Sequence, residues 1–172
     1  MFTRILVPTD FSEPSDAALE YARALADKFG ATLHLLHVIE PGYATGTFSN
    51  EAYIAVEAPG SYEMLVKEAQ AKFAYRVFPS DRARHGATTE VMTGMSAATI
   101  VEFARDQHID LIVMGTHGRT GLAHLLMGSV AEHVVRTASC PVLTVRQARV
   151  AQAVTVSRSA RISQFDTVPG LG

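Results

Sequence analysis

Residues 115–129, with the sequence GTHGRTGLAHLLMGS, have the residue types and spacing best suited to chemistry. They hold four of the chain's twelve glycines, and three of these follow the pattern Gly115-x-x-Gly118, nine residues, Gly128-Ser129. Glycine has no Cβ, so a ligand oxygen can approach the backbone N–H groups of such a loop. A helix that begins at Ser129 would add unpaired N–H groups, which attract anions. The spacing is compatible with phosphate binding, but by itself it favours an ordinary connection between a strand and a helix.

The standard phosphate and nucleophile motifs do not account for this segment. No lysine follows any of its glycines, which excludes the G-x-x-x-x-G-K-[ST] loop, and the dinucleotide pattern G-x-G-x-x-G is absent. Ser129 lacks the second glycine of the hydrolase pattern G-x-S-x-G. The position of residues 115–129 in the fold therefore decides whether they bind phosphate.

Apolar runs that alternate with helical patterns predict the elements around this segment. The first predicted strand is the apolar run that begins RILVPTD at 4–10 and is closed by a turn at Pro8 and Asp10. The other predicted strands are ATLHLLHVI at 31–39, TTEVMTG at 88–94, DLIVMG at 110–115 and CPVLTV at 140–145. The predicted helices cover residues 11–30, 61–78, 96–109 and 129–138. Parallel strands need long crossovers, so this alternation predicts an α/β fold with a single doubly wound five-stranded parallel sheet and helices on both faces.

Capping and breaking residues set the expected ends of these helices. Ser12 and Ser96 are suitable N-caps, and Gly30 is a suitable C-terminal stop. Pro79 is expected to stop or kink the second helix near Phe78. Residues 40–60 show no sustained period and are expected to form a long loop, of the kind that is usually functional or mobile.

The expected topology brings two segments together. In an open parallel sheet, ligands bind at the carboxyl ends of the strands, where the strand order reverses. Pro8, Thr9 and Asp10 follow the first strand, and Gly115–Gly118 follow the fourth. We expect these two strand ends to be neighbours at the switch point, which places an acid beside a glycine-rich loop. Asp10 could also be only a turn or capping residue.

Two long segments resemble the universal stress protein family. They are ILVPTDFSEPSDAALEYARALA near the start and DLIVMGTHGRTGLAHLLMGSVAEHVVRTASCPVLTVR near the end. The likeness is to the ATP-binding branch, whose pattern Gly-2x-Gly-9x-Gly-[Ser/Thr] is matched without a gap. It implies a Rossmann-like fold, similar to adenine nucleotide alpha hydrolases, over residues 1–146. Residues 147–172 would be a C-terminal extension, which we expect to be mobile. The sequences TGMSAAT and SDRARHGA depart from the family pattern in the middle of the chain.

The resemblance also implies which positions would bind ATP. The positions near adenine and ribose would be Pro8, Thr9, Asp10 and Val38, with Met114 and Gly115 against the ribose and phosphates. The positions around the phosphate chain would be His117, Gly118, Gly128, Ser129 and Val130, with Arg119 able to reach the γ-phosphate or solvent. Magnesium or manganese could bridge the phosphates through their oxygens.

The function implied is a nucleotide-dependent module in stress response or signalling. Family members pair their last strand with that of a second copy, so a homodimer through Pro141–Val145 is expected. No residue of the motif is an obvious general base beside the γ-phosphate, so we expect no efficient catalysis and assign no catalytic residue. The alternatives are a slow ATP hydrolase or adenylyl-transferring enzyme in the same cleft, and a nucleotide-free dimeric scaffold.

Composition and the remaining polar residues argue against several other kinds of protein and site. A formal charge of −2 gives no support to nucleic-acid binding. Cys140, the single cysteine, cannot form an internal disulfide, and no segment reads as a signal peptide or membrane span, so a cytoplasmic protein without membrane partners is expected. His34 and His37 lie three apart on a strand and so face opposite ways, and no dedicated metal site is expected. Cys140 is more simply a small packed residue than a nucleophile.

Overall fold

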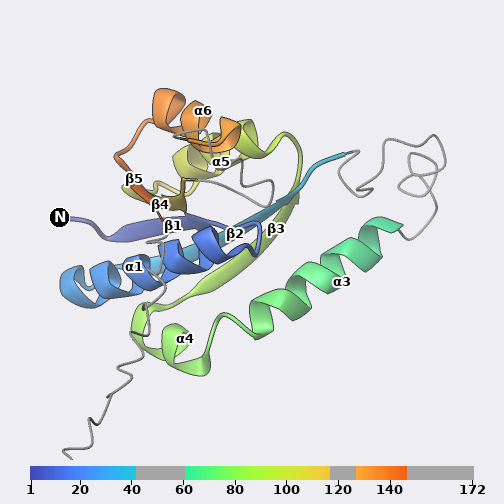
Figure 1. Ribbon diagram of the computed structural model, residues 1–172. Helices are drawn as coiled ribbons and strands as arrows, with labels where there is room; N and C mark the ends of the chain where they lie inside the picture. The colour runs from blue at the N-terminus through green and yellow to red at the C-terminus, as the bar shows by residue number, and fades with distance from the viewer. Residues whose placement is uncertain (42–60, 117–126, 147–172) are drawn as a thin grey trace, which may run out of the picture.

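The computed structural model describes residues 1–41, 61–116 and 127–146. Most of the expected 40–60 loop, His117, Gly118, Arg119 and the extension 147–172 lie outside the described residues. The strands are β1 (Arg4–Pro8), β2 (Thr32–Ile39), β3 (Thr88–Thr93), β4 (Leu111–Gly115) and β5 (Val142–Val145). The helices are α1 (Glu13–Phe29), α3 (Ser61–Ala74), α4 (Pro79–His85), α5 (Ser96–Asp106) and α6 (Ser129–Thr137) (Figure 1).

The five strands form one parallel sheet in the order β3-β2-β1-β4-β5, which confirms the predicted fold class. β1 lies in the centre, with Leu6 paired to His34 of β2 and to Ile112 of β4. The chain moves outward from β1 to β2 and β3, then crosses back to β4 and β5. The strand order therefore reverses between β1 and β4, where the sequence predicts the switch point.

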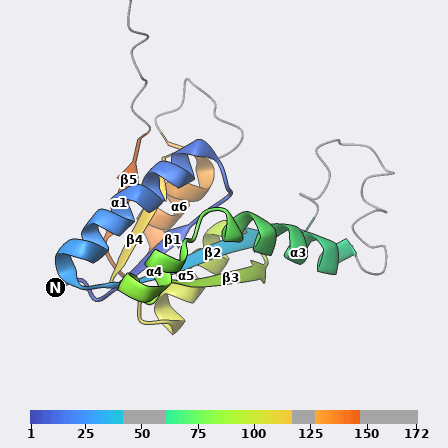
Figure 2. The same cartoon turned by 90° about the horizontal axis from the view of Figure 1, so that it is seen from below.

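Alternate side chains of the strands pack into two separate cores. Ile5 and Val7 point toward α1 and join a cluster with Phe73 and Val77. Leu6 points the opposite way, into a cluster formed with α5 and α6. Figures 1 and 2 show the helices that cover the sheet, with α1, α3 and α4 on one face and α5 and α6 on the other. Both faces of the sheet are covered, which explains why its central strands are apolar throughout.

Helix α1 follows the sequence signals closely at both ends. Ser12 occupies its N-cap position, and Gly30 ends it with φ +66° while donating its N–H to Ala26 O at 2.8 Å. An alanine-rich stripe that includes Ala18 and Ala22 is buried against the sheet. Within the three described ranges, no helix is both long and apolar enough to cross a membrane.

The second predicted helix was wrong in its extent. A continuous helix was expected to reach Phe78, but α3 ends at Ala74 and a separate helix, α4, begins at Pro79. Proline suits the first position of a helix, because its missing N–H would have no intrahelical partner there. The Asp81 carboxylate then accepts a hydrogen bond from Phe78 N at 2.9 Å. Pro79 therefore begins α4 as well as ending the preceding segment, and the sequence reading missed this short helix.

The predicted cap of α5 was also displaced by one residue. Met95 is the N-cap, and Ser96 is the first helical residue. The N–H of Ser96 donates to Glu40 Oε1 at 2.9 Å, so a carboxylate from the end of β2 satisfies the helix start. This partner is 56 residues away in the sequence, and local capping patterns could not identify it.

A two-point ion pair fixes α4 to α1. Arg23 of α1 donates to Asp81 through Nε at 2.9 Å and through Nη2 at 2.7 Å, and the Asp81 side chain is almost completely buried. Burial by itself raises the pKa of Asp81, but the hydrogen bonds from Arg23 and Phe78 outweigh it, and the pKa lies below its ordinary value. Asp81 therefore stays ionised in the folded protein and stabilises it.

The free energy of unfolding should depend on pH through the ion pair between Arg23 and Asp81. A carboxylate with a lowered folded pKa adds stability above its unfolded pKa, about 3.9, and this stability is lost as pH falls through the folded pKa. At pH 7 we expect Asp81→Asn to lower the free energy of unfolding by about 1.5–3 kcal/mol, and the difference from wild type to shrink below about pH 4. Urea unfolding at several pH values measures this.

The control is Asp106→Asn, which removes an exposed ion pair with Arg105. Its effect should stay within about 0.5 kcal/mol at every pH. An Asp81→Asn effect that is equally small at neutral pH, or that does not change with pH, would contradict the assigned role.

Gly115 allows the start of α1 to approach the end of β4. A Cβ added at Gly115 would lie 2.9 Å from both the carbonyl carbon and the carbonyl oxygen of Pro14. Real Cβ atoms essentially never come so close to backbone, so only glycine fits at this position without a shift of the helix. The structure thus gives Gly115 a packing role, which the sequence suggests only under the alternative of a nucleotide-free scaffold.

The variant Gly115→Ala should therefore lose stability even without ligand. Because the clash is with backbone, α1 must shift, and we expect the free energy of unfolding to fall by about 1–3 kcal/mol. Chemical denaturation of the ligand-free protein measures the loss. A variant as stable as wild type would mean that the Pro14 contact does not restrict this position.

Candidate functional site

The carboxyl ends of β1 and β4 meet at one edge of the sheet. The two strands are parallel and paired, so Pro8 and Gly115 leave the sheet in the same direction. The N–H of Gly128 donates to Thr116 O at 2.7 Å, which brings the start of α6 to the end of β4. The loop that contains Asp10, the end of β4 and the start of α6 therefore lie at the switch point, as the sequence predicts.

The start of α6 offers backbone donors at this edge. Gly128 is the N-cap with φ −74°, and the first helical hydrogen bond runs from Glu132 N to Gly128 O at 2.9 Å. The N–H groups of Ser129, Val130 and Ala131 precede that bond, at the positive end of the helix. A group of N–H donors with a serine hydroxyl beside it is suited to an anion such as phosphate.

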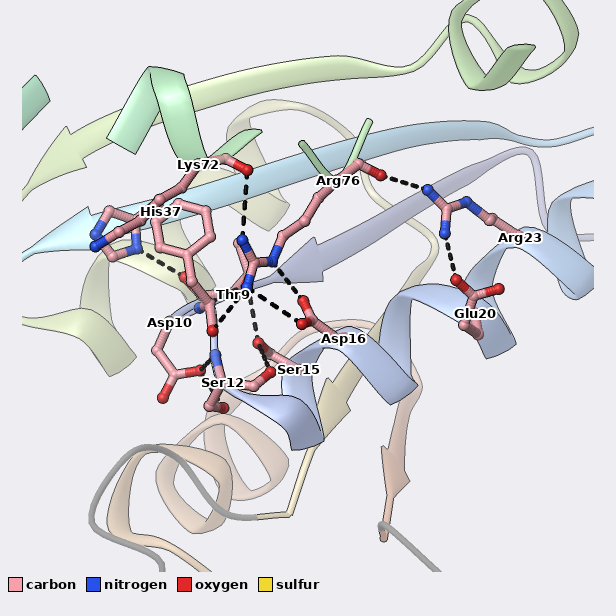
Figure 3. Close-up of polar contacts among 11 residues, drawn as sticks. Thr9, Asp10, Ser12, Ser15, Asp16, Glu20, Arg23, His37, Lys72 and Arg76 are labelled. Atoms are coloured by element: carbon pink, nitrogen blue, oxygen red, sulfur yellow. Dashed lines mark hydrogen bonds and ion pairs between the residues drawn. The ribbon is translucent and has the colours of Figure 1, made fainter. Parts of the chain in front are cut away.

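Asp10 is held in a tight turn by the residue that was expected to cap α1. Ser12 donates to Asp10 Oδ1 from its N–H at 3.1 Å and from its hydroxyl at 2.5 Å (Figure 3). Ser12 keeps the N-cap position, but its side chain is directed to Asp10 rather than to the first turn of α1. Thr9 Oγ1 accepts from Phe11 N at 3.0 Å and lies 3.0 Å from Ser15 Oγ. Asp10 therefore has a structural turn role, whatever ligand it contacts.

His37 belongs to the same loop cluster, although the sequence reading considered it only as a metal ligand, a packing residue or a surface residue. Its Nδ1 lies 2.8 Å from Thr9 O, so the tautomer with a proton on Nδ1 donates to that carbonyl. Its ring lies 4.5 Å from the Phe11 ring. The signal available in the sequence was position, because His37 stands beside Val38 near the end of β2 and parallel strands end at a common edge.

The apolar site candidates share the α5 and α6 face of the sheet. Val38, Met114 and Val130 all contribute to the core cluster on that side. Met114 is 5% exposed, so its side chain is part of the core and its backbone is the part nearest the site. Pro8 is buried at the end of β1.

A separate hollow lies between α1 and α4. Its volume is about 280 Å³, and its lining includes Arg23, Asp27, Asp81 and Arg84. These four side chains form two ion pairs, Arg23 with Asp81 at 2.7 Å and Arg84 with Asp27 at 2.6 Å. Both arginines of the lining are thus engaged by carboxylates of the protein, and the hollow lies away from the carboxyl ends of the strands, so we assign the candidate site to the switch point.

Metal-ligating and nucleophilic groups add little to the described part of the site. Within residues 1–41, 61–116 and 127–146, no three His, Cys, Asp or Glu side chains are placed to hold a metal ion. His34 lies near the hydroxyls of Thr32 and Thr88, at 3.3 and 3.1 Å, in a structural cluster on β2. Burial raises the pKa of the Cys140 thiol, with a smaller contribution from Asp110, so the thiol is protonated at neutral pH.

Comparison with known proteins places this architecture in one family. The sequence profile of the universal stress protein family matches residues 1–146. The chain is 36% identical over 152 residues to universal stress protein MJ0531 of Methanocaldococcus jannaschii, covering 86% of this chain and 84% of that protein. The structure of universal stress protein UspA from Lactobacillus plantarum aligns with a TM-score of 0.68 and 32% identity, over 84% of this chain and 98% of that one.

Two more distant structures of the same fold are nucleotide complexes. A universal stress protein in complex with cAMP aligns with a TM-score of 0.54, 24% identity and coverage of 86% of this chain and 98% of that one. The Archaeoglobus fulgidus universal stress protein in complex with dAMP aligns with a TM-score of 0.53, 24% identity and coverage of 83% and 97%. At 24% identity, these two structures support an inference about the fold alone. Together, the sheet order, the profile match and the closer relatives show that the chain belongs to the universal stress protein family.

Proposed function

We propose that this protein binds ATP at the switch point of its sheet and acts as a nucleotide-dependent module in stress response or signalling. The observation that carries the proposal is the meeting of Asp10, the end of β4 and the start of α6 at one edge. The motif Gly115-x-x-Gly118, nine residues, Gly128-Ser129 spans that edge in the sequence. An acid for the nucleoside and helical N–H groups for the phosphates are thereby available on the two sides of one site.

We assign to ATP the same residues that the family resemblance implies. Pro8, Thr9, Asp10 and Val38 would take the nucleoside, and Met114 and Gly115 the ribose side through their backbone. Gly128, Ser129 and Val130 would take the phosphates through N–H groups and a hydroxyl. His117, Gly118 and Arg119 belong to the proposal on the motif alone. The complexes of fold relatives with cAMP and dAMP are consistent with an adenine nucleotide as the ligand class.

Magnesium or manganese would enter with the nucleotide. Such ions commonly bind through phosphate oxygens and few carboxylates, so this mode of binding does not need a cluster of protein ligands. Asp10 lies at the end assigned to the nucleoside rather than beside the terminal phosphate. We therefore propose that the protein binds ATP and hydrolyses it slowly at most. We also propose that it acts in the cytoplasm.

A pair of valine substitutions in the glycine-rich sequence 115–129 tests the phosphate assignment. Gly118→Val puts a branched side chain at a motif glycine and should weaken ATP binding by roughly tenfold or more, about 1.4 kcal/mol, because it blocks backbone approach. Gly121→Val, at a glycine of the same sequence segment that is not part of the motif, is the matched control and should bind ATP nearly as well as wild type. Isothermal titration calorimetry with Mg-ATP measures both, and circular dichroism checks folding.

The same titrations separate the rival functions. ATP should bind more tightly than AMP if the glycine motif holds the terminal phosphates. A wild-type protein that ignores ATP, or equal affinities for the two valine variants, would overturn the phosphate assignment and favour a scaffold. Sustained release of phosphate or AMP that saturates with ATP would identify an enzyme.

We further propose that β5 joins two copies of the chain. Among the described strands β5 is the last of the sheet, and Pro141 O and Val145 O accept hydrogen bonds from the β4 side, from Ile112 N and Thr116 N. Backbone groups alternate along a strand, so those of Val142 and Thr144 face away from β4. Within the described residues this edge of β5 pairs with no other strand, and such an edge is a natural place for pairing with a second copy.

Replacement of Thr144 by proline tests this dimer. Thr144→Pro removes an outward N–H while proline remains tolerated at a sheet edge, so we expect a monomer where wild type is a dimer. Light scattering coupled to size-exclusion chromatography gives the mass of each. A monomeric wild type, or a variant that remains dimeric, would refute pairing through this edge.

A further inference from the structure

The turn that carries Asp10 contains a residue in an unfavourable backbone conformation. Phe11 has φ +64°, in the left-handed region that bulky side chains rarely adopt. Such a conformation persists only where surrounding contacts hold it. Phe11 lies between Asp10 and Ser12, which holds the Asp10 carboxylate, so the contacts that hold Phe11 also help to fix the position of that carboxylate.

Arg76, which comes shortly after the end of α3, supplies much of that hold. Its Nη2 donates to Phe11 O at 3.0 Å, and its guanidinium lies 5.2 Å from the Phe11 ring centroid. The same guanidinium binds Asp16, in the first turn of α1, through Nε at 2.6 Å and Nη2 at 3.2 Å. One side chain therefore joins the Asp10 turn and the start of α1 to the segment after α3 (Figure 3).

The ring of Phe11 is packed by the same region. Phe73 of α3 meets it edge-on at 5.1 Å, and Lys72 Nζ lies 5.6 Å from its centroid. His37 contacts the ring at 4.5 Å, on the β2 side. Arg76 is itself fixed, because its carbonyl accepts a hydrogen bond from Arg23 Nη2 at 2.5 Å. The cage around Phe11 is thus built mainly from α3 and the residues that follow it.

Helix α3 meets the rest of the protein largely through its C-terminal half. Ala69 and Phe73 are its buried residues, whereas Tyr62 and Met64 near its start are exposed. Both ribbon views show the N-terminal part of α3 extending beyond the sheet (Figures 1 and 2). The contact of Phe73 with Phe11 therefore belongs to the half of α3 that docks on the core, and Arg76 follows shortly after that half.

We propose that Arg76 is a positioning residue for the nucleotide site, and that docking of α3 and occupancy of the site are coupled through Arg76 and Phe11. The inference rests on the proposed function. With Arg76 docked, Phe11 keeps its left-handed conformation and the Asp10 turn keeps the geometry that receives the nucleoside. By thermodynamic linkage, a bound nucleotide then stabilises the docking of α3 by the same factor that docking strengthens nucleotide binding.

The coupling is tested in the full chain with Arg76→Gln and a matched arginine control. Arg76→Gln should weaken ATP binding by about tenfold, although Arg76 is not assigned to the nucleotide. Arg84→Gln also removes an arginine that pairs with a carboxylate of α1, Asp27, but far from the turn, and should change affinity by less than about twofold. Arg76→Lys keeps the charge without the planar fork and should fall between glutamine and wild type.

Amide hydrogen exchange supplies readouts that a purely structural role would not change. Saturating ATP should slow exchange over α3 in wild type, and this added protection should disappear in Arg76→Gln. Without nucleotide, Arg76→Gln should speed exchange at Phe11 and Ser12 while α5 keeps its wild-type protection. The nucleotide-free measurement also shows whether the variant is folded.

The outcomes distinguish this inference from the proposed function. If wild type binds ATP and Arg76→Gln binds it equally well, or if ATP leaves α3 exchange unchanged in wild type, the coupling is wrong while the proposed function stands. If wild type binds no ATP, the proposed function fails and the coupling with it. In that case, faster exchange at Phe11 still identifies Arg76 as the residue that fixes the turn, and unchanged exchange removes that role too.

Discussion

The pairing of β1 with β4 is the constraint on which the site depends. Both strands are parallel and buried, and the chain reaches β4 only after it has built β2 and β3 on the other side of β1. Helix α1 must then pass over the end of β4, where Gly115 admits the Pro14 backbone. This contact fixes the start of α1, and with it the Asp10 turn, against the β4 end of the glycine motif.

Polar contacts around the turn hold a geometry that the backbone would not adopt alone. Ser12, Thr9 and His37 each hydrogen-bond within the turn or to its carbonyl groups. Arg76 adds a contact from outside, at the cost of tying the turn to α3. The turn is therefore held by short-range hydrogen bonds from Ser12 and Thr9 and by long-range contacts from His37 and Arg76. Such a site can be rigid and still respond to the position of a helix.

Much of this arrangement follows from sequence patterns. Apolar runs identified all five strands because central strands of a parallel sheet are buried on both faces. Strand alternation and the switch-point rule brought Asp10 and Gly115 to one edge. Signals that act between distant residues were missed: α4 depends on Asp81 buried against Arg23, and the start of α5 on Glu40. Neither partner lies near enough in the sequence for a local pattern to reveal it.

The sequence by itself determined the family resemblance, the fold class with its doubly wound parallel sheet, and the spacing of the glycine motif. These features depend on the local sequence and its periodicity. Only the tertiary structure decided that Ser12 turns to Asp10, that Gly115 is required by Pro14, and that Phe11 is held in a left-handed conformation by Arg76. The physical reason is that a side chain's partner is chosen by packing between elements. Arg76, for example, hydrogen-bonds to Phe11, which lies 65 positions earlier in the chain.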